Sequence, residues 1–224
     1  MNGLALARQY YAALGRPALE RALPELVSRM ACGLAGEGSE CFGFDDALSR
    51  DHDWGAAFCI WLTQEDYDRF GARIQAVYDG LPAEENGFPI RQSGAQSGGR
   101  VGCLCMPAWY RRYTGAPEGP CTLPQWRRAP EAFLATAVNG VVFDDPSGHF
   151  SAVRERLLAF YPEDVRLKKL AARVAGMAQA GQYNYPRCVR RGESVAAQLA
   201  LAEFARAAMS TAYLLGRRYA PFYK

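Results

Sequence analysis

The sequence lacks several features that would identify whole classes of protein. It has only two histidines, His52 and His149, which excludes a metal site built mainly from imidazoles. No stretch reaches the roughly 20 apolar residues that a membrane-spanning helix needs, and the N-terminus lacks a basic segment followed by an apolar core. From these absences we expect a cytoplasmic protein with no membrane partner.

The cysteines also lack a functional pattern. There are seven, an odd number, and they are scattered without the paired spacing of a zinc ribbon. Buried free thiols are therefore the expected state of most of them. Cys103 and Cys105 could form a redox or metal-binding pair, but alternation along a buried strand explains them without special chemistry, and we favour that interpretation.

A strong net charge is missing as well. The formal net charge of +3 is too small to make nucleic acid the expected main partner. Arginine nevertheless greatly outnumbers lysine, and it suits bidentate contacts with phosphate or carboxylate. Four arginine doublets occur, and each taken singly is best explained as a solvated surface pair: 111–112, 127–128, 190–191 and 217–218.

The segment from Gly36 to Trp54, GEGSECFGFDDALSRDHDW, concentrates the chemistry that is present. Asp51 and Asp53 are two residues apart, so on an extended chain both carboxylates point to one side. Such a pair suits Mg²⁺, which takes one or two protein carboxylates and its remaining ligands from water and substrate phosphates. Gly38 and Ser39 form a turn with little side chain, which lets backbone amides and a hydroxyl approach a phosphate closely.

Other polar residues of the same segment have two interpretations each. Asp45 and Asp46 are either further metal ligands or caps of a short helical turn, and positional preference favours caps. Arg50 either binds a phosphate or forms a salt bridge with one of these two aspartates.

Apolar periodicity predicts the elements of the first half. An amphipathic helix ends at Gly15, and Pro17 begins a second one. The segment after Asp53 is almost wholly apolar, as in a central strand that is covered on both faces. The expected ranges are helices 4–14 and 17–27, strands 29–35 and 53–62, helix 63–80, a polar surface loop 82–100 and strand 101–106.

Strand signals end near residue 150. The expected ranges are helix 130–136, strand 138–143, turn 144–148, and helices 151–161, 163–180 and 194 onward, with Gly181 closing the second of these helices. In the last helix we expect Val195, Leu199, Ala202, Met209 and Tyr213 to face inward. The chain therefore divides into an α/β domain with N-terminal helices, residues 1–150, and an all-α helical C-terminal domain, residues 151–224.

The Gly-Ser turn, eleven intervening residues and Asp51-His52-Asp53 resemble the signature of the nucleotidyltransferase superfamily related to DNA polymerase beta. The longer stretches GSECFGFDDALSRDHDWG, KKLAARVAGMAQAGQYNYPRC and RRYAPFYK are similar to the bacterial DUF4037 family, which is described as nucleotidyltransferase-like. The resemblance implies a nucleotidyltransferase-like α/β fold with a small mixed sheet.

The resemblance also implies roles for individual residues. Asp51 and Asp53 would be catalytic and bind Mg²⁺ or Mn²⁺, while Gly38 and Ser39 would hold the phosphates of a nucleoside triphosphate, with ATP as the expected donor. The superfamily adds a third carboxylate on a later strand, but the matching segment 101–106 contains no acid. Asp144 or Asp145 could replace it, although DDPSG is more typical of a turn with Asx hydrogen bonds.

The helical half offers further candidates. Lys168 and Arg187 are equally consistent with phosphate binding and with an exposed helix surface. Tyr183, Asn184 and Tyr185 could contact a base, but interdomain packing is the simpler explanation. The helical part would help to form the site of the acceptor, which the sequence leaves open as a small molecule, a protein or RNA.

Three functions compete on this basis. The first is nucleotidyl transfer to an acceptor, and the second, suggested by the missing third acid, is a weak or inactive nucleotide-binding or protein-interaction module. The third takes Asp-x-Asp as a glycosyltransferase or phosphatase motif. The chain ahead of Asp51 is too short for the former, and the residues preceding this aspartate are too polar for the latter, so this remains a distant alternative.

Overall fold

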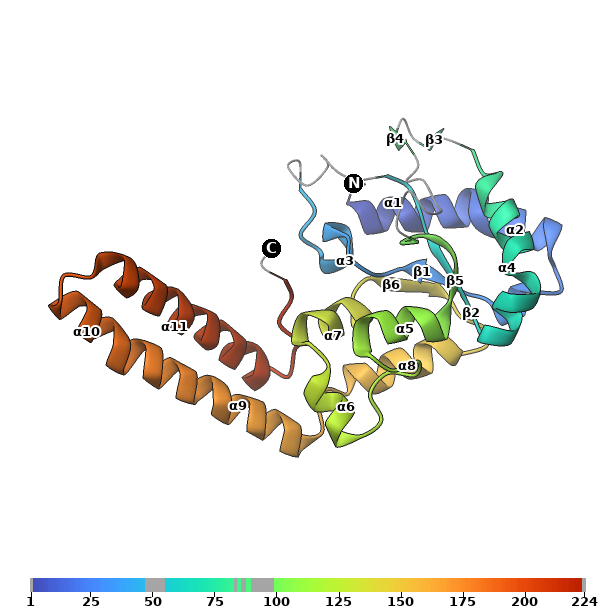
Figure 1. The fold of residues 1–224 in the computed structure, drawn as a ribbon. Coiled ribbons are helices and arrows are strands. Elements are labelled where there is room, and N and C mark those ends of the chain that lie inside the picture. The colour runs from blue at the N-terminus through green and yellow to red at the C-terminus, as the bar shows by residue number, and fades with distance from the viewer. Residues whose placement is uncertain (1, 47–54, 83, 86–87, 90–98, 223–224) are drawn as a thin grey trace.

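A four-stranded mixed sheet forms the centre of the N-terminal part of the protein (Figure 1). The computed structural model describes residues 2–46, 55–82, 84–85, 88–89 and 99–222. The strands are β1 (Ala31–Leu34), β2 (Cys59–Leu62), β5 (Gly102–Cys105) and β6 (Val141–Asp144), in the order β5-β2-β1-β6. Strand β1 is antiparallel to β2 and β6, and β2 is parallel to β5. The expected small mixed sheet is thus confirmed.

Helices account for most of the remaining described chain. They are α1 (Gly3–Tyr10), α2 (Arg16–Ala22), α3 (Ser39–Phe42), α4 (Gln64–Asp79), α5 (Met106–Thr114), α6 (Leu123–Arg128), α7 (Glu131–Val138), α8 (His149–Leu158), α9 (Glu163–Met177), α10 (Tyr185–Arg190) and α11 (Ser194–Leu215). Two π-helical segments, η1 (Tyr11–Gly15) and η5 (Ala178–Asn184), and a short 3-10 helix, η2 (Val27–Arg29), complete the set. Within the expected loop 82–100, β3 (Glu84–Glu85) pairs with β4 (Phe88–Pro89).

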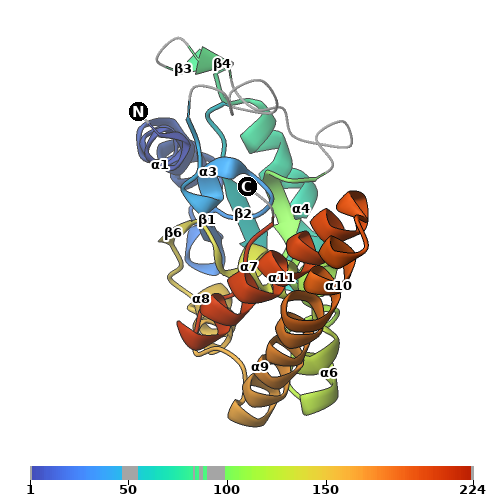
Figure 2. The same ribbon diagram turned by 90° about the vertical axis from the view of Figure 1, so that its left-hand side faces the viewer.

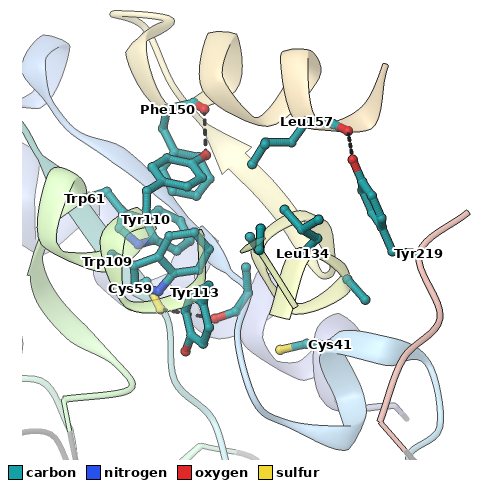
Figure 3. Packing of buried hydrophobic residues seen from close by; sticks show 14 of the residues in the cluster. Cys41, Cys59, Trp61, Trp109, Tyr110, Tyr113, Leu134, Phe150, Leu157 and Tyr219 are labelled. Carbon is teal, nitrogen blue, oxygen red and sulfur yellow. Dashed lines mark hydrogen bonds between the residues drawn. The ribbon is translucent and has the colours of Figure 1, made fainter. Parts of the chain in front are cut away.

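Both faces of the sheet are covered, because successive side chains of β2 point in opposite directions. Phe58 and Ile60 pack with residues of α1, α2 and α4, whereas Cys59 and Trp61 pack with residues of α5, α7 and α8. On the second face Trp61 stacks on Phe150 of α8 with ring centroids 4.0 Å apart (Figure 3). The prediction of a central strand buried on both sides is confirmed for β2, in which all residues are buried.

The structure confirms the local patterns that were strongest in the sequence. Helix α4 begins after Thr63, whose hydroxyl accepts a hydrogen bond from the amide of Asp66 at 3.2 Å. Cys103 and Cys105 both lie in β5 and are buried, as expected for alternation along a strand. Helices α5 and α6 were not among the expected elements, although each begins with a proline in its first turn. Pro107 and Pro124 occupy these positions, where the missing amide of a proline costs nothing.

Two glycines that were expected to end helices do not do so. Gly15 has a helical φ of −63° and lies in η1, which joins α1 to α2 without a break, and Gly181 lies in η5 between α9 and α10. A Cβ atom on Gly15 would lie 2.5 Å from the ring of Phe58, and one on Gly181 would lie 2.6 Å from the ring of Phe204. Both glycines thus serve close packing against an aromatic ring.

Helices α9 to α11 form a long antiparallel hairpin that extends away from the sheet (Figures 1 and 2). The prediction that Val195, Leu199 and Met209 face inward is wrong, since their exposed fractions are 70%, 68% and 60%. Small residues of α11, such as Ala197 and Ala207, are buried instead. Alanines and glycines let the two helices approach closely, so the larger apolar side chains are left outside.

None of the helices in the described ranges is both long enough and apolar enough to cross a membrane.

Helix α8, which begins at His149, packs into the body of the protein. Its residues Phe150 and Leu157 belong to the same buried cluster as Trp61 (Figure 3). The expected domain boundary at residue 150 remains a prediction.

Candidate functional site

The Gly-Ser turn follows β1 directly, as the sequence predicted. Gly36 has a φ of +128°, a conformation that favours glycine because a side chain would strain it. Gly38 has an extended backbone, and a Cβ atom there would collide with the carboxylate of Glu40, a buried residue in the first turn of α3. Ser39 begins α3 and is buried. The turn is therefore closely packed on its inner side.

Asn139, which follows α7, holds this turn in place. Its side-chain oxygen accepts a hydrogen bond from the amide of Gly36 at 2.9 Å, and its side-chain nitrogen donates to the carbonyl of Gly36 at 2.7 Å. The amide of the next residue, Gly140, donates to the carbonyl of Cys41 at 2.8 Å. The Asn-Gly dipeptide thus connects the end of α7 to both sides of the Gly-Ser turn.

The guanidinium of Arg154 supports the same corner from α8. It donates hydrogen bonds to the carbonyl oxygens of Val138, Asn139 and Gly140 at 2.8, 3.4 and 3.2 Å. A cation at the C-terminal end of a helix is also favoured by the helix dipole. Burial lowers the pKa of Arg154, but arginine stays charged at neutral pH because its ordinary pKa is so high.

Charged side chains gather on the outer side of the turn. The carboxylate of Glu37 lies 2.9 Å from the guanidinium of Arg112 on α5 and 3.4 Å from that of Arg100, just ahead of β5. All three side chains are partly exposed to solvent. From the sequence, Arg112 was expected only to be one of a solvated surface pair with Arg111. No sequence signal indicated that Glu37, Arg100 and Arg112 would lie together.

Three strand ends come together beside these residues. The thiol of Cys59, the first residue of β2, donates to the carbonyl of Arg100 at 3.2 Å and lies 4.0 Å from the carbonyl oxygen of Ala35. The amide of Gly102 donates to the carbonyl of Phe58 at 3.0 Å. The end of β1 and the starts of β2 and β5 therefore share one edge of the sheet.

The predicted acidic pair cannot be placed in this geometry. Asp51, Asp53 and Arg50 lie outside the described residues. The chain becomes described again at Gly55, which is buried and precedes β2. Within the described residues, no group of three or more His, Cys, Asp or Glu side chains is arranged to hold a metal ion.

The candidate replacements for a third carboxylate have other contacts. Asp144 pairs in register with Cys32, near the start of β1 and so at the end of this strand away from the Gly-Ser turn. Its carboxylate contacts Arg16 at 3.1 Å and the hydroxyl of Tyr11 at 3.4 Å. The described strand β5 contains no acid.

Asp145 forms the expected Asx turn. Its carboxylate accepts hydrogen bonds from the amides of Gly148 and Ser151 at 3.0 and 2.8 Å and from the hydroxyl of Ser147 at 3.1 Å. Asp45 accepts a hydrogen bond from the amide of Gly3, the first residue of α1, at 2.6 Å, and the N-cap of that helix is Asn2. The expectation that Asp45 and Asp46 cap a short helical turn of their own segment stays a prediction, because the residues that follow them lie outside the described ranges.

The candidates from the helical half lie apart from the turn. Arg187 is on α10, at the far end of the hairpin in Figure 1, with its guanidinium 5.9 Å from the ring of Tyr183. Lys168 is exposed on α9. Asn184 accepts a hydrogen bond from Gln179, and Tyr185 is exposed. The structure brings none of these side chains to Gly38 and Ser39.

A cavity of about 360 Å³ lies on the other side of α3. Its lining includes Phe42 and Phe44, whose rings are stacked with centroids 6.0 Å apart, and Tyr213, Arg217 and Arg218 from the C-terminal segment. The hydroxyl of Tyr219, which also lines the cavity, donates to the carbonyl of Leu157 at 2.7 Å and anchors this segment on α8 (Figure 3). The cavity thus combines aromatic surfaces with positive charge, next to the helix that the Gly-Ser turn begins.

Strained backbone is found at the same cavity. Phe160 and Arg217 have φ angles of 77° and 50°, and among the described residues they are the non-glycine residues with positive φ. Both line the cavity. The guanidinium of Arg217 is held by the carboxylate of Glu163 at 3.0 Å. Strain of this kind persists where surrounding contacts enforce it, and it often marks ligand sites.

Comparison with known families supports part of the resemblance. The model of the family "Domain of unknown function (DUF4037)" matches residues 126–224, which begin within α6 and include Asn139 and the C-terminal segment but not the Gly-Ser turn. This part of the chain is thus similar to that family. No curated protein and no solved structure matches the chain.

Proposed function

We propose that this protein binds a nucleoside triphosphate, with ATP as the expected donor, and transfers its nucleoside monophosphate to an acceptor. One observation carries the proposal. The Gly-Ser turn and the start of β2 share one sheet edge, where Cys59 contacts the carbonyl oxygens of Ala35 and Arg100. Asp51 and Asp53 precede β2 in the sequence, and the proposal assigns them to this edge.

The described residues have defined tasks in this proposal. In this proposal the backbone amides of the turn after Gly36 contact the phosphates, while Asn139 binds the amide and carbonyl of Gly36 and keeps the turn in one conformation. Arg112 and Arg100 supply positive charge, and their contact with Glu37 holds them beside the turn. A bound triphosphate would compete with the Glu37 carboxylate for these guanidinium groups, because arginine binds phosphate and carboxylate in the same geometry.

In this proposal the ligands of the divalent cation are residues outside the described ranges. Asp51 and Asp53 would hold Mg²⁺ or Mn²⁺, and two carboxylates match the number that Mg²⁺ takes when phosphates supply further ligands. When bound, the cation would neutralise charge on the phosphates. The acceptor oxygen bonds to the α-phosphorus as the bond to pyrophosphate breaks, and Gly38, Ser39 and the two arginines hold the leaving group.

The cavity beside α3 is the proposed site of the acceptor. Its stacked Phe42 and Phe44 suit a flat ring, and Arg217 and Arg218 suit an anionic group. A volume of about 360 Å³ is within the usual range for small-molecule sites. We therefore favour a small aromatic acceptor with a negative charge.

A second function, nucleotide binding without turnover, is favoured by one specific observation. Within the described residues, β5 has no acid, Asp144 lies near the opposite end of β1, and Asp145 caps a turn. The third carboxylate of the superfamily thus has no evident substitute here. Binding at the turn would remain possible because it needs backbone amides and arginines rather than this acid.

Nucleotide binding and pyrophosphate release separate the two functions. Isothermal titration with each of the four ribonucleoside triphosphates and Mg²⁺ or Mn²⁺ measures binding, and α-labelled ATP measures turnover. The double variant Asp51→Asn/Asp53→Asn should lose both. The matched control Asp68→Asn/Asp79→Asn changes charge equally on exposed residues of α4 and should keep both. Binding without pyrophosphate release identifies the inactive form, and no binding of any triphosphate by the wild type contradicts both functions.

The arginine arrangement has its own test. Arg112→Gln should weaken triphosphate binding about tenfold or more, because a hydrogen bond to a charged group is worth roughly 1.5–3 kcal/mol. Arg111 precedes it on α5, is exposed and has no ion-pair partner among the described residues, so Arg111→Gln should change affinity less than twofold. Equal effects of the two variants would show that only general positive charge matters.

A further inference from the structure

The α9–α11 hairpin has small residues inside and large apolar residues outside. Inside, a Cβ atom on Gly181 would touch Phe204, and one on Gly176 would lie 4.0 Å from the Cβ atom of Ala207. Outside, Val195, Leu199 and Met209 of α11 are 70%, 68% and 60% exposed. Monomeric proteins rarely expose large contiguous apolar patches, and such patches often mark interaction surfaces. Among the described residues, nothing covers the outer face of α11, although its composition is typical of a covered surface.

The exposed residues of α11 follow a coiled-coil spacing. Val195, Leu199, Ala202, Arg206 and Met209 are separated alternately by four and three residues, as are the a and d positions of a heptad. Val195 precedes the buried Ala197 by two residues, which places it about 200° away around the helix. The seam thus points away from α9 and is available to another helix.

Helix α11 has fewer charged residues than is usual for a helix whose outer face is exposed to water. Its 22 residues include only Glu203 and Arg206 as charged side chains, and these form an ion pair with each other at 2.7 Å. An exposed helix usually carries a charged face. A helix that binds an anionic membrane surface usually carries several Lys or Arg residues on its polar face, whereas α11 has a single arginine that Glu203 already neutralises.

We propose that a second copy of this chain covers the outer face of α11. The two α11 helices are antiparallel about a two-fold axis that passes the helix at the level of Phe204. This pairing makes the seam self-complementary. Leu199 of each copy faces Met209 of the other, since both lie five residues from the axis. Arg206 of each copy faces the small Ala202 and lies near the other Glu203, so the two ion pairs form a neutral cluster at the centre. Closed two-fold pairing is the commonest form of homo-oligomer.

The mass of the full chain in solution tests this proposal. Light scattering after gel filtration, from about 1 to about 100 µM protein, should give the mass of a dimer. Leu199→Glu should give a monomer with unchanged helix content, because this side chain is exposed within one chain, and its thermal midpoint should no longer depend on protein concentration. Leu123 of α6 is also exposed, so Leu123→Glu is a matched control that should remain dimeric. A monomeric wild type, or a dimer of Leu199→Glu, would overturn the proposal.

The register provides a sharper test. Met209→Lys alone should also give a monomer, but Leu199→Glu/Met209→Lys should recover the dimer, because the opposite charges then face each other on both sides of the axis. A double variant that remains monomeric would overturn the antiparallel pairing at Phe204.

Flotation with anionic phospholipid vesicles tests the alternative that this face binds a membrane surface. Vesicle binding by a monomeric wild type that is lost in Leu199→Glu would assign the face to a membrane surface instead.

Discussion

The side-chain amide of Asn139 forms two hydrogen bonds with the backbone of Gly36, one to its amide at 2.9 Å and one from the Asn139 nitrogen to its carbonyl at 2.7 Å. The two residues are far apart in sequence. The contact joins the end of α7 to the turn after β1, and this turn is part of the proposed phosphate site. Substitution of Asn139 therefore tests both the stability of the protein and its binding of triphosphate.

Asn139→Asp should destabilise the protein by about 1–3 kcal/mol. The substitution retains an oxygen for the Gly36 amide but replaces the donor by a second oxygen that faces the Gly36 carbonyl. Urea unfolding measures the loss, and triphosphate affinity should fall at the same time because the turn is less restrained. The control Asn184→Asp keeps the oxygen that accepts from Gln179 on the exposed hairpin, and its unfolding free energy should stay within about 0.5 kcal/mol.

Gly140 and Gly148 form a matched pair of glycines with nearly equal φ angles of 63° and 72°. A Cβ atom on Gly140 would collide with the carbonyl of Leu34, whereas the space around Gly148 is open. Gly148→Ala should cost about 1 kcal/mol from backbone strain alone. Gly140→Ala should cost about 2–4 kcal/mol, because steric overlap adds to the same strain. Equal losses in urea unfolding would show that the β1–β6 corner relaxes freely.

Asp145→Ala should lower stability by about 0.5–2 kcal/mol through loss of the cap on α8. Triphosphate affinity should be unchanged, because the three hydrogen bonds of Asp145 are directed at its own turn. Thermal unfolding and titration calorimetry measure the two effects. Loss of pyrophosphate release in a variant that still folds and binds ATP would instead identify Asp145 as the third carboxylate.

The buried thiols make stability depend on alkaline pH. Burial raises the pKa of Cys103 to about 12, compared with about 8.5 in an unfolded chain. Below pH 8.5 the thiol is protonated in both states and its full contribution is present. As the pH rises from about 8.5 towards 12, the unfolded chain loses the proton while the folded chain keeps it, so stability falls by up to about 1.4 kcal/mol per pH unit.

Comparison of variants isolates this effect from other titrating groups. Between about pH 8.5 and 10 the unfolding free energy of Cys103→Ala should fall by about 1.6 kcal/mol less than that of the wild type. Parallel slopes of the wild type and Cys103→Ala in urea unfolding would contradict the proposed burial of this thiol.

The local elements were largely predictable from the sequence. Helix α4 was predicted from apolar residues at three- and four-residue spacing and from the cap at Thr63, and β2 from its unbroken apolar run. These signals are local, because one helix or strand needs only its own periodicity and ends. The Gly-Ser turn after β1 was predicted for the same reason, although its function and that of Asp51 and Asp53 stay predictions.

Other features depend on residues that are distant in the chain. Gly15 and Gly181 were expected to end helices, but whether a glycine ends a helix or admits an aromatic ring depends on what packs against it. The sequence determined by itself that α11 is a helix with an apolar seam. Only the tertiary structure decided that this seam points outward, because α9 packs against the alanines of the opposite face. Likewise, only the fold brings Glu37, Arg100 and Arg112 together, since side-chain contacts across a sheet edge depend on strand order.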